Sequence, residues 1–220
     1  MPTVEDDTES SIDVSDMIAS HDGMRKEFGS LPLLVKSIPD GASDRAATVS
    51  DHIELMTTFM TVHHDCEDEL LWPIAQERAP EHEAIFVMER EHDALNASLK
   101  RVDELSHAWR SDPTANNRAA LHTELIALEK DLLKHLGHEE REALPLLATV
   151  ITEDEYRAYG AKVRASLTPE QGRLILSLIL EDTSPSTREA VLEAMSPEAR
   201  ADYEQTGHQL ARDYKSTLLG

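Results

Sequence analysis

The sequence predicts an all-α fold. Hydrophobic residues make up 40 % of the 220 positions, enough to cover a core, whereas aromatic residues make up 4 % and glycines number eight. Ala, Leu and Glu are abundant, and alternating runs of β-branched residues are missing, which favours helices over strands. Apolar residues recur every three or four positions in four successive stretches. Four such helices with short connections predict an antiparallel up-down-up-down four-helix bundle with a C-terminal helical extension.

The first predicted helix covers about residues 14–38 and ends at the Pro-Asp-Gly turn of residues 39–41. Its apolar positions advance alternately by three and four residues, the pattern of a helix that faces a bundle. Pro32 interrupts this helix and is expected to kink it. The second helix begins near Ser43, a candidate N-cap, and Pro73 marks its last turns.

The third predicted helix follows Pro80, and its apolar stripe continues to Val102. Residues 111–113 are typical of a turn that supplies the N-cap and first position of the next helix. The fourth helix repeats the apolar pattern of the second and continues to Leu146. We therefore assign residues 12–150 to the four-helix bundle.

Residues 151–220 are predicted to form an accessory helical extension. Its segments are short, and each opens with a residue suited to capping: Thr152, Thr168, Ser184 and Ser196. Its most apolar stretch, residues 174–180, needs a partner surface. The sequence leaves two roles open for it, covering the bundle or contacting a second copy of the chain or another protein.

The charge of the chain excludes two classes of partner. Acidic residues number 43 against 21 basic ones, a formal charge of −22, which repels nucleic acid and anionic membrane surfaces. The N-terminal stretch has neither the basic nor the apolar region of a signal peptide, and Cys66 is the single cysteine. We expect a cytoplasmic protein with no disulfide framework.

One histidine breaks the apolar stripe near the middle of each predicted helix: His21, His63, His92 and His135. Four buried imidazoles without partners would be costly. Glu67 and Glu139 follow two of them by one helical turn, so that these side chains point in the same direction as their histidines. Two carboxylates and four imidazoles at one level are typical of a dinuclear metal site.

An internal repeat supports this interpretation. The spacing His63-x3-Glu67-x5-Pro73 recurs as His135-x3-Glu139-x5-Pro145, and each unit follows a helix that carries one further histidine. The bundle thus consists of two similar helix pairs, each supplying two histidines and one glutamate. One metal ion per pair with shared carboxylates is the simplest arrangement.

The paired motifs HHDCEDELLWP and HLGHEEREALP, which begin at His63 and His135, resemble the hemerythrin-like, HHE cation-binding family. The resemblance covers roughly residues 14–148. It implies two non-haem irons, one bound by His21 and His63 and the other by His92 and His135. Glu67 and Glu139 would bridge them together with a solvent oxygen. Asn96 occupies the position where the oxygen-carrying hemerythrins have a further histidine, so the resemblance favours a more open iron site over reversible oxygen storage.

Several neighbouring residues compete for these roles. His64 and His138 compete with His63 and His135 as ligands but lie one residue off the stripes, and His64 is also a candidate for an open position or an outer contact. Asp68 or Glu140 could replace a bridging glutamate. Glu142 lies on the stripe, and we interpret it as a residue at the end of the core rather than as an acceptor for a ligand. Five histidines lie off the stripes or outside the bundle and are expected at the surface: His52, His82, His107, His122 and His208. We expect Cys66, Tyr156, Tyr159, Tyr203 and Tyr214 to be packing residues.

These observations predict a non-haem di-iron protein that reacts with oxygen, hydrogen peroxide or nitric oxide, including catalase-like turnover of peroxide in oxidative stress. The alternative is a sensor or regulatory protein in which the metal state controls how residues 151–220 dock. Zinc in a structural role is a third hypothesis, because the affinity order of divalent metals does not favour iron.

Overall fold

The computed structural model describes residues 12–181, 183–193 and 195–220, and within these ranges the chain is helical without a β-strand. The prediction of an all-α fold is confirmed. The first seven elements are α1 (Ser15–Ser37), α2 (Ser43–Leu70), α3 (Trp72–Arg78), α4 (Glu83–Ser111), α5 (Ala115–His138), the π-helix η1 (Glu139–Ala143) and α6 (Leu144–Val150).

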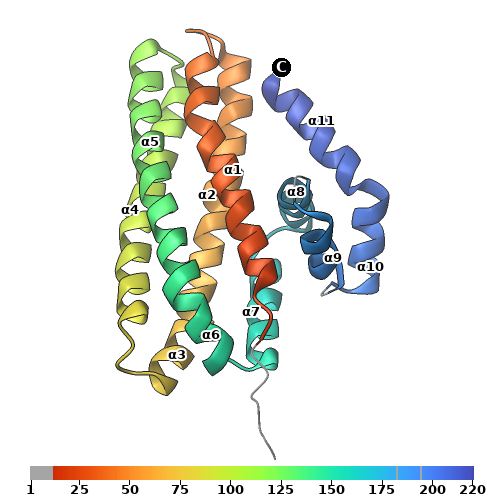
Figure 1. Ribbon diagram of the computed structural model, residues 1–220. Coiled ribbons are helices and arrows are strands. Elements are labelled where there is room, and N and C mark those ends of the chain that lie inside the picture. Colours follow the sequence, from red (N-terminus) through yellow and green to blue (C-terminus); the bar gives the residue numbers. More distant parts are fainter. Residues whose placement is uncertain (1–11, 182, 194) are drawn as a thin grey trace, which may run out of the picture.

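The long helices α1, α2, α4 and α5 lie side by side (Figure 1), and contacts run from α1 to α2, α2 to α4, α4 to α5 and α5 back to α1. Their apolar stripes meet in two buried clusters. The main core includes Phe28, Ile53, Leu99 and Leu128, and the second cluster includes Met17, Ile85 and Met88. The spacing of three and four residues therefore placed the core-facing positions correctly in these helices. Pro32 lies inside α1 and is buried without ending the helix.

Two predicted helix caps differ from those in the structure. Ser43 is the first residue of α2, preceded by Ala42, and no side chain caps this end. The cap of α5 is Thr114, whose hydroxyl accepts a hydrogen bond from the backbone N–H of Asn117, so the turn of residues 111–113 ends one residue before the cap.

The second and fourth predicted helices are each interrupted within one turn of the glutamate of their motif. Leu71 separates α2 from α3, and the π-helical turn η1 separates α5 from α6. Pro73 and Pro145 explain both breaks, because proline cannot donate the hydrogen bond of a continuous α-helix. The wider turn changes which side faces the core: Ala143 is buried and Glu142 is exposed. The interpretation of Glu142 as a core residue was wrong.

The later segments are α7 (Glu153–Ser166), α8 (Pro169–Leu180), α9 (Pro185–Glu193), α10 (Pro197–Asp202), the π-helix η2 (Tyr203–Gly207) and α11 (His208–Leu219). The predicted caps at Thr152, Thr168 and Ser196 are confirmed, the first two as complete capping boxes. These elements lie along α1 and α2 (Figure 1), and Ile175 and Leu178 of α8 join the main core. The apolar stretch of residues 174–180 thus covers the bundle. No helix within the described ranges is long and apolar enough to cross a bilayer.

Candidate metal centre

The structure buries all six predicted ligands and brings them to one level of the bundle. His21 comes from α1, His63 and Glu67 from α2, His92 from α4, His135 from α5 and Glu139 from the start of η1. Two groups of side chains result, each with its candidate ligand atoms within 4.8 Å of one another. One group consists of His21, His63, Glu67 and Glu139, and the other of His64, His92 and His135.

Each of the four predicted histidines is held through its Nδ1 atom. For three of them the partner is a carboxylate oxygen: Glu140 Oε1 at 3.0 Å from His21, Asp68 Oδ1 at 2.7 Å from His92 and Glu91 Oε2 at 3.4 Å from His135. These acceptors favour the tautomer with its proton on Nδ1, which leaves the lone pair of Nε2 available. Asp68 and Glu140, the alternative candidates for a bridging role, therefore orient histidines instead.

The fourth histidine, His63, has a different partner. The hydroxyl of Tyr159 lies 3.0 Å from His63 Nδ1 and 3.5 Å from Glu67 Oε1. With the proton of the imidazole on Nδ1, His63 donates to the tyrosine oxygen and the tyrosine donates to Glu67. Tyr159 belongs to α7, so one residue of the extension contacts two residues of this group. The prediction of a packing role alone was wrong for Tyr159.

The Nε2 atoms of these histidines are buried and have no hydrogen-bond partner. Each glutamate lies between two of these Nε2 atoms, one from each group of ligands. The distances are 3.0 Å from Glu67 to His63 and 3.5 Å to His92, and 3.4 Å from Glu139 to His21 and 3.5 Å to His135. Glu67 and Glu139 thus connect the two groups of ligand atoms.

The electrostatics of the centre disfavour its charged forms. Burial raises the pKa of Glu67 to about 8 and that of Glu139 to about 7. Burial lowers the pKa of His63 to about 4 and that of His135 to about 2, the latter with a contribution from neighbouring histidines. Cations at this level would compensate the carboxylates and engage the unpaired nitrogen atoms. The donor set, imidazole nitrogen with carboxylate oxygen, fits iron or zinc.

His64 is the candidate ligand that the apolar pattern placed off the stripe. Its side chain is fully buried, both ring nitrogens lack a hydrogen-bond partner, and it belongs to the group with His92 and His135. The stripe predicts one buried face, but α2 contacts α1 and α4 and is also covered by α7 and α11. More than one face of α2 is therefore buried.

The same cause accounts for His52, which was expected at the surface. It is fully buried, with Nδ1 at 3.1 Å from the Tyr214 hydroxyl and Nε2 at 3.4 Å from Glu27 Oε2. This cluster joins α1, α2 and α11, away from the centre. Cys66 is buried in an apolar cluster, and burial raises the pKa of its thiol, as suits a packing residue.

A family model for the hemerythrin HHE cation-binding domain matches residues 13–147, more than half of the chain. The chain belongs to this family. Among the curated proteins and the solved structures, none matches it significantly. Because the match ends at residue 147, Tyr159 and the rest of the extension lie beyond the hemerythrin HHE domain.

Proposed function

We propose that this hemerythrin-like chain is a non-haem di-iron protein that reacts with oxygen, hydrogen peroxide or nitric oxide, including catalase-like peroxide turnover. The observation that carries the proposal is the pair of buried ligand groups, whose Nε2 atoms lack hydrogen-bond partners and which Glu67 and Glu139 connect. Burial of these imidazoles and carboxylates costs free energy, and bound cations would compensate that cost.

His21 and His63 would hold the first iron and His92 and His135 the second, with Glu67, Glu139 and a solvent oxygen as bridges. Bound iron would supply a redox couple and coordination positions for a small ligand. His64, which shares a group with His92 and His135, would be a third imidazole for the second iron. The first group has no third histidine among the described residues, so we assign the open position to the side of His21 and His63.

The protein's own residues would orient the ligands and exclude water. Asp68, Glu91 and Glu140 accept from three histidines, and Tyr159 accepts from the fourth. Each of these contacts fixes a tautomer and a ring orientation before metal binds, which reduces the cost of assembling the centre.

The proposal is tested on protein produced with adequate iron. We expect two irons per chain by metal analysis, an optical spectrum of a bridged ferric pair, and consumption of added peroxide with evolution of oxygen. A well-loaded preparation with one metal ion per chain would overturn the two-iron assignment. Zinc at full occupancy from iron-replete cells would favour a structural role.

The contact of Tyr159 with His63 favours the second candidate function, a sensor in which the metal state controls the docking of the extension. Metal binding would fix the position of His63, and α7 contacts His63 directly through Tyr159. Hydrogen exchange of residues 153–180 with and without iron tests this candidate. Protection that rises more than tenfold on iron binding, with no turnover of peroxide, would favour the sensor over the enzyme.

A further inference from the structure

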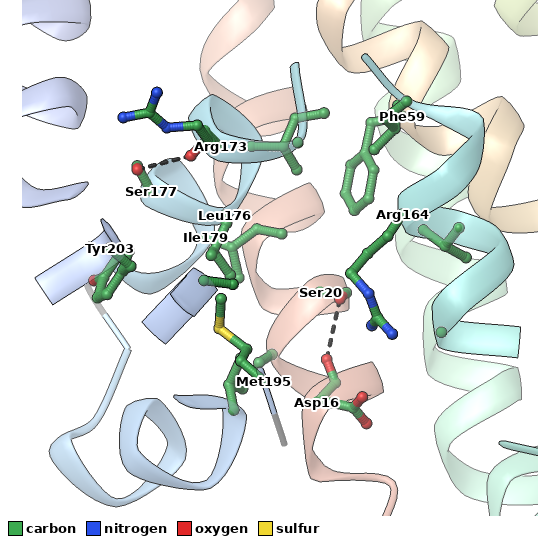
Figure 2. Close-up of a pocket in the computed structure, with 18 of the residues that line it drawn as sticks. Asp16, Ser20, Phe59, Arg164, Arg173, Leu176, Ser177, Ile179, Met195 and Tyr203 are labelled. Carbon is green, nitrogen blue, oxygen red and sulfur yellow. Dashed lines mark hydrogen bonds between the residues drawn. The ribbon is translucent and has the colours of Figure 1, made fainter. Parts of the chain in front are cut away.

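A pocket of about 420 Å3 lies between the bundle and the extension. Figure 2 shows it between Leu176 and Ile179 of α8 on one side and Phe59 and Arg164 on the other. Sites for organic ligands have volumes of roughly 300–1,000 Å3. The space is far larger than oxygen, nitric oxide or peroxide requires.

The walls of the pocket are mainly apolar. Phe59 of α2, Val163 and Leu167 of α7, and Leu176 and Ile179 of α8 contribute aromatic and aliphatic surface. His63 and Tyr159 also line it, so the pocket reaches the residues beside the metal centre. A mainly apolar lining with few polar groups favours a ligand with an alkyl body.

The rim offers one positive group that is free to meet a ligand. Across the described parts of the chain, the exposed Arg164 has no hydrogen-bond or ion-pair partner, whereas Arg173 pairs with Asp202 at 2.8 Å. Asp16 accepts through its Oδ1 atom from the Tyr156 hydroxyl and from the backbone N–H of Met17. In Figure 2 the Arg164 guanidinium points toward Ser20 and lies above Asp16.

We propose that this pocket binds a medium-chain fatty carboxylate, with the alkyl chain between α2, α7 and α8 and the carboxylate at Arg164. The formal charge of −22 opposes the approach of any anion, so burial of the alkyl chain must supply most of the affinity. The local contact with Arg164 then selects a carboxylate over a neutral or cationic head group. This inference does not depend on the identity of the metal.

Gly172 provides a way to fill the pocket without disturbing its walls. It lies in α8 and lines the pocket, and a Cβ atom added there would meet no heavy atom within 4 Å. Gly172→Leu should therefore occupy the space and also improve helix propensity. Ala165→Leu is the matched control, because Ala165 is an exposed residue of α7 that does not line the pocket.

The experiment is isothermal titration calorimetry of the full chain, as purified with its metal, against octanoate, decanoate and dodecanoate. We expect saturable binding of one molecule, tightening by up to roughly fourfold per added methylene until the pocket is full. Decan-1-ol and decyltrimethylammonium should bind more weakly than decanoate. Arg164→Gln should weaken decanoate by roughly three- to tenfold and leave decan-1-ol unchanged.

Gly172→Leu should abolish decanoate binding, whereas Ala165→Leu should retain it, both with unchanged metal content and thermal melting no lower than that of the parent chain. Three results would overturn the proposal: no saturable decanoate binding, equal affinity for the three decyl head groups, or full binding by a folded Gly172→Leu chain. Metal content and peroxide turnover are measured on the same samples, so failure of the di-iron function would be seen separately.

Discussion

The imidazole of His64 stacks on that of His92, with ring centroids 4.2 Å apart and planes inclined by 17°. Both rings also meet His135 edge to face, at 5.0 Å and 4.8 Å. Burial and the neighbouring histidines lower the pKa of His64 well below its ordinary value, so the ring is neutral and keeps a lone pair. The second group therefore contains three imidazoles, although Asn96 occupies the position where the oxygen carriers have their additional histidine.

We predict that His64→Leu weakens binding of the second metal by at least roughly tenfold, since it removes one imidazole of three. Metal titration followed by elemental analysis should then give closer to one than two tightly bound ions. His52→Gln is the matched control on the same helix, and it should keep both. Unchanged binding in His64→Leu would show that His64 only packs against His92.

Glu67→Ala and Glu139→Ala should lower metal occupancy more than any substitution of Asp68 or Glu140. Each removed carboxylate contacts both ligand groups, whereas Asp68 and Glu140 each contact one histidine. For Asp68→Asn and Glu140→Gln we expect losses of roughly 10- to 100-fold in affinity. Elemental analysis of the four variants gives the ranking. Equal losses across all four would contradict the assignment of the bridging role.

The sequence predicted those parts of the centre that depend on helix periodicity. One stripe residue per helix and one repeated spacing are enough to find four histidines and two glutamates. The residues that it misplaced depend on how elements far apart in the chain pack. His52 is buried because α11 of the extension covers it, and His64 is buried because it faces His92 of α4 and His135 of α5. Glu142 is exposed because the π-helical turn that begins at Glu139 rotates the later residues of the helix.

Tyr159 shows the same limit. No spacing relates it to His63, which lies 96 residues earlier, and only the docking of α7 brings them together. Tyr159→Phe should leave the fold intact but remove the acceptor for His63 Nδ1 and a donor to Glu67. We expect a roughly tenfold weaker first metal site, measured by competition with a chelator. Tyr156→Phe, which loses only a contact with Asp16, should bind metal like the parent chain.

The shifted pKa values predict how the metal-free chain responds to pH. Glu67 and Glu139 bind protons more tightly when folded, so their stabilisation is lost as pH rises from their ordinary value near 4.5 toward about 8 and about 7. His63 and His135 resist protonation when folded, so stability is lost as pH falls below about 6.5. Between about pH 4.5 and 6.5 these two effects on stability oppose one another.

The metal-free chain should therefore lose thermal stability as pH rises from about 6.5 to 8, because in this interval Glu67 and Glu139 hold protons in the folded chain that they have already lost in the unfolded chain. Bound metal should remove this loss of stability. Metal binding should also release about two protons per chain at pH 6.5, and the number released should fall toward zero at pH 9. Melting temperatures and proton release into weak buffer measure both effects. Glu67→Gln should reduce the release by about one proton, and an unchanged release would contradict the raised pKa.

The reaction with oxygen tests where the open position lies. Reduced, iron-loaded protein mixed with oxygen should convert to the ferric state and should not return to the ferrous state under vacuum. Asn96→His would add an imidazole one helical turn after His92, beside the group that already has three. If small ligands react on the side of His21 and His63, this substitution should change the rate of peroxide consumption by less than about twofold. A fall of tenfold or more in the rate of peroxide consumption would instead place the reactive position at the second group. Reversible uptake of oxygen by the parent protein, without peroxide consumption, would indicate an oxygen carrier.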